Sequence, residues 1–65
     1  MSSTYTIEGA ECIAETDNAI RVSAPEIGTA WIPKNQVHYD SEVFKLGGKG
    51  ELVVSQWFAE QRGWV

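Results

Sequence analysis

The chain holds few residues of the types that carry out chemistry. His38 is the sole histidine and Cys12 the sole cysteine among 65 residues. An isolated histidine beside Val37 and Tyr39 is weak evidence for acid–base catalysis, because no second group can be assigned to it. Glu11 next to Cys12 disfavours a reactive thiolate, and a single cysteine excludes an internal disulfide or a multi-cysteine metal site. The sequence therefore predicts a protein that is not an enzyme and that has no metal site and no cofactor.

Two short segments have a superficial likeness to ligand loops. Residues 15–18 (Glu-Thr-Asp-Asn) contain part of a calcium loop, but no glutamate stands at the twelfth position. Residues 47–50 (Gly-Gly-Lys-Gly) suggest a phosphate loop, but they lack the serine or threonine that follows the lysine of the Walker pattern. Both segments are interpreted as turns.

The charge of the chain is unevenly placed. The net charge is −4 and the pI about 4.7, and the whole excess lies in residues 1–30, where Arg21 is the only basic residue. We call the acidic residues of this half the predicted acidic surface: Glu8, Glu11, Glu15, Asp17 and Glu26. Carboxylates repel phosphate backbones and attract basic surfaces, so the sequence predicts a protein partner with a basic nucleic-acid-binding surface. The alternative, that these charges only keep the domain soluble, stays open.

Direct binding of single-stranded nucleic acid is the second functional hypothesis. Small barrels bind single strands by combining basic grooves with exposed aromatic rings. Aromatic and lysine side chains that could share one face are Trp31, Tyr39, Lys34, Lys45 and Lys49. The acidic net charge opposes this function, because phosphates would be repelled.

The elements that must position these residues follow from pattern and turn chemistry. Residues 4–8 alternate as in a half-buried strand, and Gly9 shifts the parity, which predicts a bulge. Residues 16–18 predict a turn, residues 19–24 a return strand that ends at Pro25, and residues 29–32 a third strand. Residues 42–46 and 51–54 predict a second hairpin across the glycine-rich turn.

A short helix is predicted at the end of the chain. Ser55 is the expected N-cap, residues 56–62 contain no breaker, and Gly63 suits the left-handed position that follows a helix. The predicted fold is α+β: a small, bent antiparallel sheet of four or five strands with one short C-terminal α-helix, forming a single domain over residues 1–65. Because a chain this short needs its large apolar groups inside, we expect most aromatic rings in the core. The predicted core residues are Ile7, Ile20, Val22, Trp31, Val53, Trp57 and Phe58.

Two segments resemble a pattern in short uncharacterised proteins of bacteria, phages and mobile elements. Residues 31–37 (Trp-Ile-Pro-Lys-Asn-Gln-Val) are similar to a WIPKSQ segment, and residues 52–63 are similar to VVPxWFAExKG. Asn35 replaces the serine of this pattern and Ser55 its proline. The resemblance covers about half of the chain and implies a common scaffold. In size and acidity the chain is also similar to small anti-CRISPR and other phage inhibitors, some of which mimic nucleic acid.

These observations predict a non-enzymatic protein-binding module. The expected role is that of a phage-encoded, anti-CRISPR-like inhibitor, a DNA mimic whose acidic surface blocks a nucleic-acid-binding site on its partner. A CRISPR effector subunit is one candidate for this partner. The longest apolar runs are too short for a transmembrane span or a signal peptide. We therefore expect a protein of the bacterial host cytoplasm that contacts no membrane.

Overall fold

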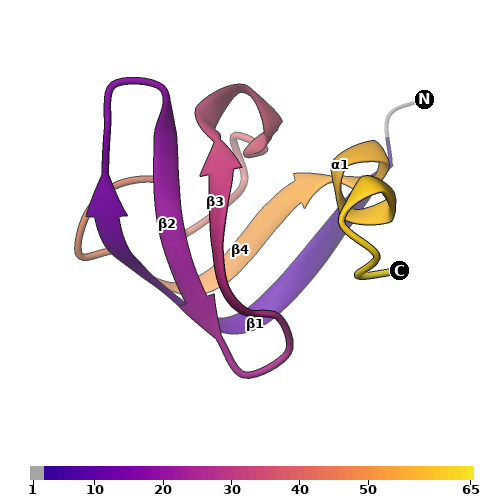
Figure 1. The fold of residues 1–65 in the computed structure, drawn as a ribbon, viewed down its shortest axis with the longest axis horizontal. Coiled ribbons are helices and arrows are strands. Elements are labelled where there is room, and N and C mark those ends of the chain that lie inside the picture. Colours follow the sequence, from indigo (N-terminus) through magenta and orange to yellow (C-terminus); the bar gives the residue numbers. More distant parts are fainter. Residues whose placement is uncertain (1–2) are drawn as a thin grey trace.

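Residues 3–65 fold into four strands, a 3-10 turn and one short α-helix (Figure 1). The computed structural model describes residues 3–65. The elements are β1 (Thr4–Glu15), β2 (Ala19–Ala24), β3 (Gly28–Pro33), the 3-10 turn η1 (Lys34–Gln36), β4 (Lys49–Ser55) and α1 (Gln56–Gln61). The predicted α+β class, with a small antiparallel sheet and one C-terminal helix, is confirmed.

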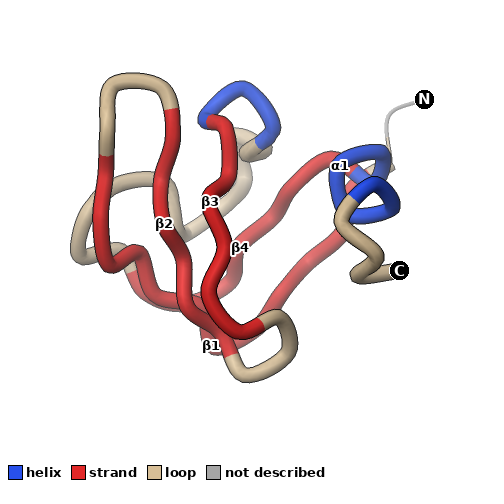
Figure 2. Tube along the Cα trace, in the orientation of Figure 1, coloured by secondary structure: helices blue, strands red, loops and turns tan. Residues whose placement is uncertain are grey.

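The sheet has the order β3-β2-β1-β4, so the first and last strands are neighbours. The second half of β1 pairs with β2, and β4 pairs with β1 from Thr4 to Glu11. Figure 2 shows the bend that lets one long strand serve both partners. The β1–β4 register shifts between Ile7 and Ala10, where Gly9 has φ +69°, a left-handed value that glycine adopts readily. The predicted bulge at Gly9 is therefore present, and a second irregularity lies between Cys12 and Ala14.

The core is mostly aliphatic. Its fully buried side chains include Ile7, Ile20, Val22, Ile32, Val43, Leu52 and Val54. Of the predicted core, Ile7, Ile20, Val22, Val53 and Phe58 are confirmed as buried. The prediction was wrong for Trp31, which is 45% exposed, and for Trp57, which is 61% exposed.

The exposure of these two tryptophans has a local cause in each element. In β3 the buried residues are Ala30 and Ile32, so the alternation of the strand turns Trp31 to the opposite face, where it pairs with Arg21. In α1 the buried residues are Phe58 and Ala59, and Trp57 lies outside this buried pair. The expectation that most aromatic rings are needed in the core was therefore wrong.

The predicted second hairpin also differs from the structure. Residues 42–46 form no strand. Residues 37–42 run beside β4 instead: Val37 forms an isolated bridge with Val54, and the amides of His38 and Glu42 donate to the carbonyls of Val53 and Glu51 at 2.8 and 2.9 Å. Because residues 37–42 follow β3 and η1, this pairing brings the two ends of the sheet toward each other.

The end of the chain forms the predicted capped helix. The Ser55 hydroxyl accepts a hydrogen bond from the amide of Phe58 at 3.1 Å, and Gly63 has φ +78° after the helix. The Trp64 ring then meets the Phe58 ring edge-on at 5.6 Å. Phe58 and Ala59 belong to the core, and Trp64 packs against it, so the buried face of the helix is held on the sheet. Within residues 3–65, α1 and η1 are the only helical segments, and neither has the length and apolar character of a membrane span.

Candidate functional site

Three exposed apolar side chains occur in one irregular segment, residues 39–46, which we call the 39–46 loop; Trp57 and Val65 are exposed elsewhere. Tyr39 is 90% exposed, Leu46 60% and Phe44 54%. Between them, Ser41 and Val43 are buried. The loop therefore has buried residues between exposed apolar ones, although its backbone is not a strand.

The backbone of the 39–46 loop is fixed by the Ser41 hydroxyl. This oxygen donates to the carbonyl of Val43 at 2.7 Å and accepts from the amides of Val43 and Val53 at 3.2 and 3.1 Å. Val43 is completely buried in the core. The hydroxyl thus joins the loop to β4, and the exposed rings are carried on a backbone with defined geometry.

Glu15 holds the far end of the loop. Its carboxylate accepts from the Lys34 ammonium at 2.6 Å and from the amide of Leu46 at 3.1 Å. The hydrogen bond from Lys34, followed by that from Leu46, lowers the pKa of Glu15 below its ordinary value. One carboxylate at the end of β1 therefore connects η1 with the 39–46 loop.

We expect the Glu15 contacts to make stability depend on pH. Because the pKa of Glu15 is lowered in the folded state, its stabilising effect is complete above the ordinary value of 4.5 and is lost as the pH falls through the lowered pKa. Melting temperatures measured from pH 7 to pH 3 should fall more steeply for the wild type than for Glu15→Gln. The control is Glu8→Gln, at an exposed carboxylate of β1. Identical profiles for the wild type and Glu15→Gln would contradict this role.

A hollow of about 270 Å³ lies against the loop. Its lining consists of Lys34, Val37, His38, Tyr39, Ser41 and Phe44. The His38 ring stacks on the Tyr39 ring with 4.2 Å between centroids, and the Lys45 ammonium lies 5.6 Å from the Phe44 centroid. A second hollow of about 330 Å³ shares Val37, His38 and Tyr39 but is otherwise lined by polar residues of η1, of β4 and of the start of the described chain around Thr4. The His38–Tyr39 pair therefore lines both hollows.

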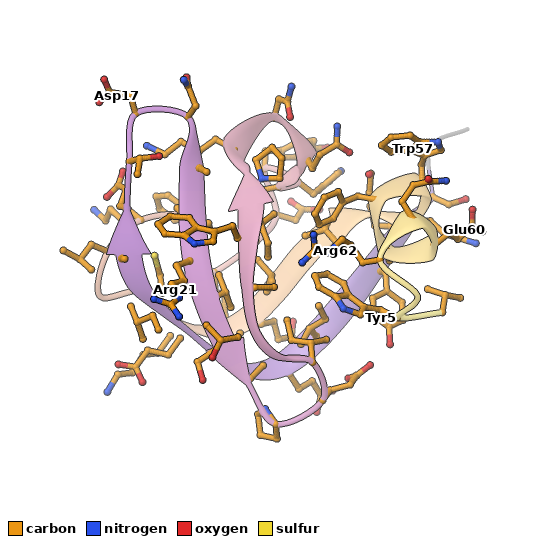
Figure 3. The ribbon with its side chains drawn as sticks, viewed as in Figure 1. Tyr5, Asp17, Arg21, Trp57, Glu60 and Arg62 are labelled. Atoms are coloured by element: carbon orange, nitrogen blue, oxygen red, sulfur yellow. The ribbon has the colours of Figure 1, made fainter. Side chains whose placement is uncertain are left out.

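The residues of the predicted acidic surface do not gather in one place. Asp17 lies in the turn between β1 and β2, whereas Glu26 lies in the turn at the other end of β2. Figure 3 shows Asp17 at the upper left, far from Tyr5, whose hydroxyl donates to the Glu26 carboxylate. This hydrogen bond and the nearby negative charge raise the pKa of Tyr5. Glu15 and Glu26 are thus engaged within the molecule.

Glu8 and Glu11 lie exposed on β1, and the pairing with β4 determines their neighbours. Glu51 lies opposite the Glu8–Gly9 bulge, and Lys49 pairs with Glu11. Glu42 approaches the same place, because its carboxylate accepts from the amide of Glu51 at 2.8 Å. Glu42 and Glu51 were absent from the predicted acidic surface, because only the pairing of the first strand with the last brings them beside Glu8.

The residues of the nucleic-acid hypothesis are also separated. Lys34 and Tyr39 line the same hollow, together with Phe44. Trp31 instead lies beside Arg21 on the outer face of β2 and β3, and Lys49 lies opposite Glu11. The described structure therefore brings together part of the proposed aromatic and basic face.

The buried Cys12 thiol donates to the carbonyl of Ala14 at 3.2 Å, and burial raises the pKa of this thiol. Among the residues that the structure describes, no three His, Cys, Asp or Glu side chains are grouped so that they could hold a metal ion. Comparison of the chain with protein-family models, with curated proteins and with solved structures finds no match.

Proposed function

We propose that the chain is a non-enzymatic protein-binding module whose contact surface is centred on the 39–46 loop. The observation that carries this proposal is a fixed backbone that presents Tyr39, Phe44 and Leu46 to solvent. A small domain gains stability by burying such groups, so leaving three exposed on a rigid segment favours a role in recognition. Aromatic side chains on a preorganised surface also bind partners at a low cost in entropy.

The charge around the loop defines the partner. Asp40 and Glu42 are exposed on the loop, and the Lys34 charge is compensated by Glu15. Together with the net charge of −4, this favours a partner with a basic surface. In this proposal the basic surface is one that otherwise holds nucleic acid, so that the chain acts as an inhibitor similar to small phage-encoded proteins, including the anti-CRISPRs.

The test is affinity capture from a bacterial lysate with the immobilised chain. We expect the variant Tyr39→Ala/Phe44→Ala/Leu46→Ala to lose a partner that the wild type retains, because truncating several central apolar groups removes most of the binding energy. The matched control is Trp57→Ala, which removes a 61% exposed aromatic ring from α1. Circular dichroism and thermal melts are used to check that both variants are folded.

The outcomes of this capture experiment separate clearly. A partner that is retained by Trp57→Ala and lost by the triple variant supports the proposal. A partner that the triple variant retains, or that Trp57→Ala loses equally, contradicts it.

Single-stranded nucleic acid is kept as a second candidate because Tyr39 is 90% exposed beside a hollow that Lys34 and His38 also line. An exposed aromatic ring beside a lysine is an arrangement on which bases stack. A labelled oligonucleotide that binds the wild type at physiological salt, and binds Tyr39→Ala less tightly, would favour this function over the first.

A further inference from the structure

The hollow beside the 39–46 loop has the size of a side-chain site. Its volume is about 270 Å³, whereas pockets for drug-sized ligands usually measure about 300–1,000 Å³. Tyr39 and Phe44 supply aromatic walls, and Val37 adds an aliphatic group. This combination fits one flat apolar group that enters from a larger partner.

The electrostatics of the hollow favour an uncharged occupant. The Lys34 ammonium is held by the Glu15 carboxylate at 2.6 Å, so its charge is compensated. The Ser41 hydroxyl is saturated by the backbone groups of Val43 and Val53. Neither group therefore demands a charged or strongly polar partner inside the hollow.

The rim of the hollow on the His38 side has the opposite character. The Asp40 carboxylate is 70% exposed and lies 3.7 Å from Nδ1 of His38, which lines the hollow. On the other side, the Lys45 ammonium lies 5.6 Å from the centroid of the Phe44 ring. A chain segment that flanks an inserted group on the His38 side would meet the Asp40 carboxylate, which favours a basic residue there.

We propose that this hollow receives a single aromatic side chain of the partner protein, flanked on the partner by lysine or arginine residues. This inference rests on the proposed function and adds the chemistry of the partner's anchor. Burial of one ring between Tyr39 and Phe44 supplies the apolar contact, and Asp40 selects the flanking charge.

The test uses amide shifts of the ¹⁵N-labelled full chain during titration with short peptides. The probe has one tryptophan between lysines, and matched peptides replace the tryptophan by alanine or the lysines by glutamates. We expect shifts in residues 37–44 with the probe, and about tenfold weaker binding of both matched peptides. Phe44→Ala should weaken binding of the probe about tenfold, whereas Trp57→Ala, which removes an exposed ring of α1 outside the 39–46 loop and the lining of the hollow, should leave it unchanged.

Several outcomes would overturn the inference. These are shifts confined to α1 or β3, equal binding of the alanine peptide, equal losses in Phe44→Ala and Trp57→Ala, or stronger shifts of residues 37–44 with an oligothymidylate at equal concentration. If no peptide binds while the triple loop variant still loses the captured partner, this inference fails and the proposed function stands. If the probe binds as expected but capture is independent of the loop, the proposed function fails instead.

Discussion

Replacing Ser41 by alanine is expected to remove about half of the stability of the domain. The Ser41 side chain is buried, and its hydroxyl is the hydrogen-bond acceptor for the amides of Val43 and Val53. Alanine would leave these amides without that acceptor in an apolar environment, at a cost of about 1–3 kcal/mol for each unsatisfied group. Domains of this size are stable by only about 3–5 kcal/mol, so a loss of about 2–3 kcal/mol is large.

Urea denaturation followed by circular dichroism measures this loss. Ser23→Ala is the control, because Ser23 lies on β2 and, within the described residues, its hydroxyl makes no hydrogen bond. We expect the control to stay within about 0.5 kcal/mol of the wild type. A Ser41→Ala variant as stable as the wild type would show that water replaces the hydroxyl, and that the loop is not held as described.

The regular elements could be predicted from the sequence because each of them carries a local signal. The turn at residues 16–18 is closed by Thr16, whose hydroxyl accepts from the amide of Ala19 at 3.1 Å. Pro25 and Pro33 mark the ends of two strands, and Ser55 caps the helix. In these cases the identity of one or two residues determines the backbone conformation, so nearby residues alone predict it.

The candidate site depends on contacts between distant segments, which local signals do not reveal. Glu15 binds Lys34 and the amide of Leu46, a residue 31 positions away. The Ser41 hydroxyl can hold the loop only because β4, with the amide of Val53, lies beside it. Residues 42–46 have the pattern of a strand in the sequence, whereas tertiary contacts bury Val43 and leave Phe44 and Leu46 in solvent.

The predicted acidic surface failed to form one patch for a related reason. Residues 1–30 are contiguous in sequence, but the two turns that hold Asp17 and Glu26 lie at opposite ends of β2. A strand separates its ends by about 3.3 Å per residue, so neighbouring carboxylates in the sequence become distant on the sheet. The acidic residues that remain available for steering a partner are Glu8, Glu11 and Asp17, whose exposed carboxylates have no hydrogen-bond or ion-pair partner among the described residues. Glu8 and Glu11 lie toward the Pro25 end of β2, and Asp17 lies at its other end, so these three charges act on a partner through the field of the whole domain and not as one patch.

Reversing these three charges should slow association strongly and leave the fold intact. The variant Glu8→Lys/Glu11→Lys/Asp17→Lys changes the net charge from −4 to +2. Because long-range attraction to a basic partner becomes repulsion, we expect the association rate to fall about tenfold or more at low salt, and added salt to accelerate binding instead of slowing it. The unfolding free energy should change by less than about 1 kcal/mol, since all three sites are exposed.

Stopped-flow association with the captured partner over a range of ionic strength measures this effect, and Glu60→Lys is the matched control. Glu60 lies on α1, away from Asp17 in Figure 3, and its reversal changes the charge by the same amount per residue. If Glu8, Glu11 and Asp17 steer the partner, the reversal of each of them slows association more than Glu60→Lys does. Equal effects per reversed charge would mean that only the total charge acts. An unchanged rate and salt dependence in the triple reversal would eliminate a basic partner surface, while the apolar contact of the 39–46 loop would still be tested by its own variants.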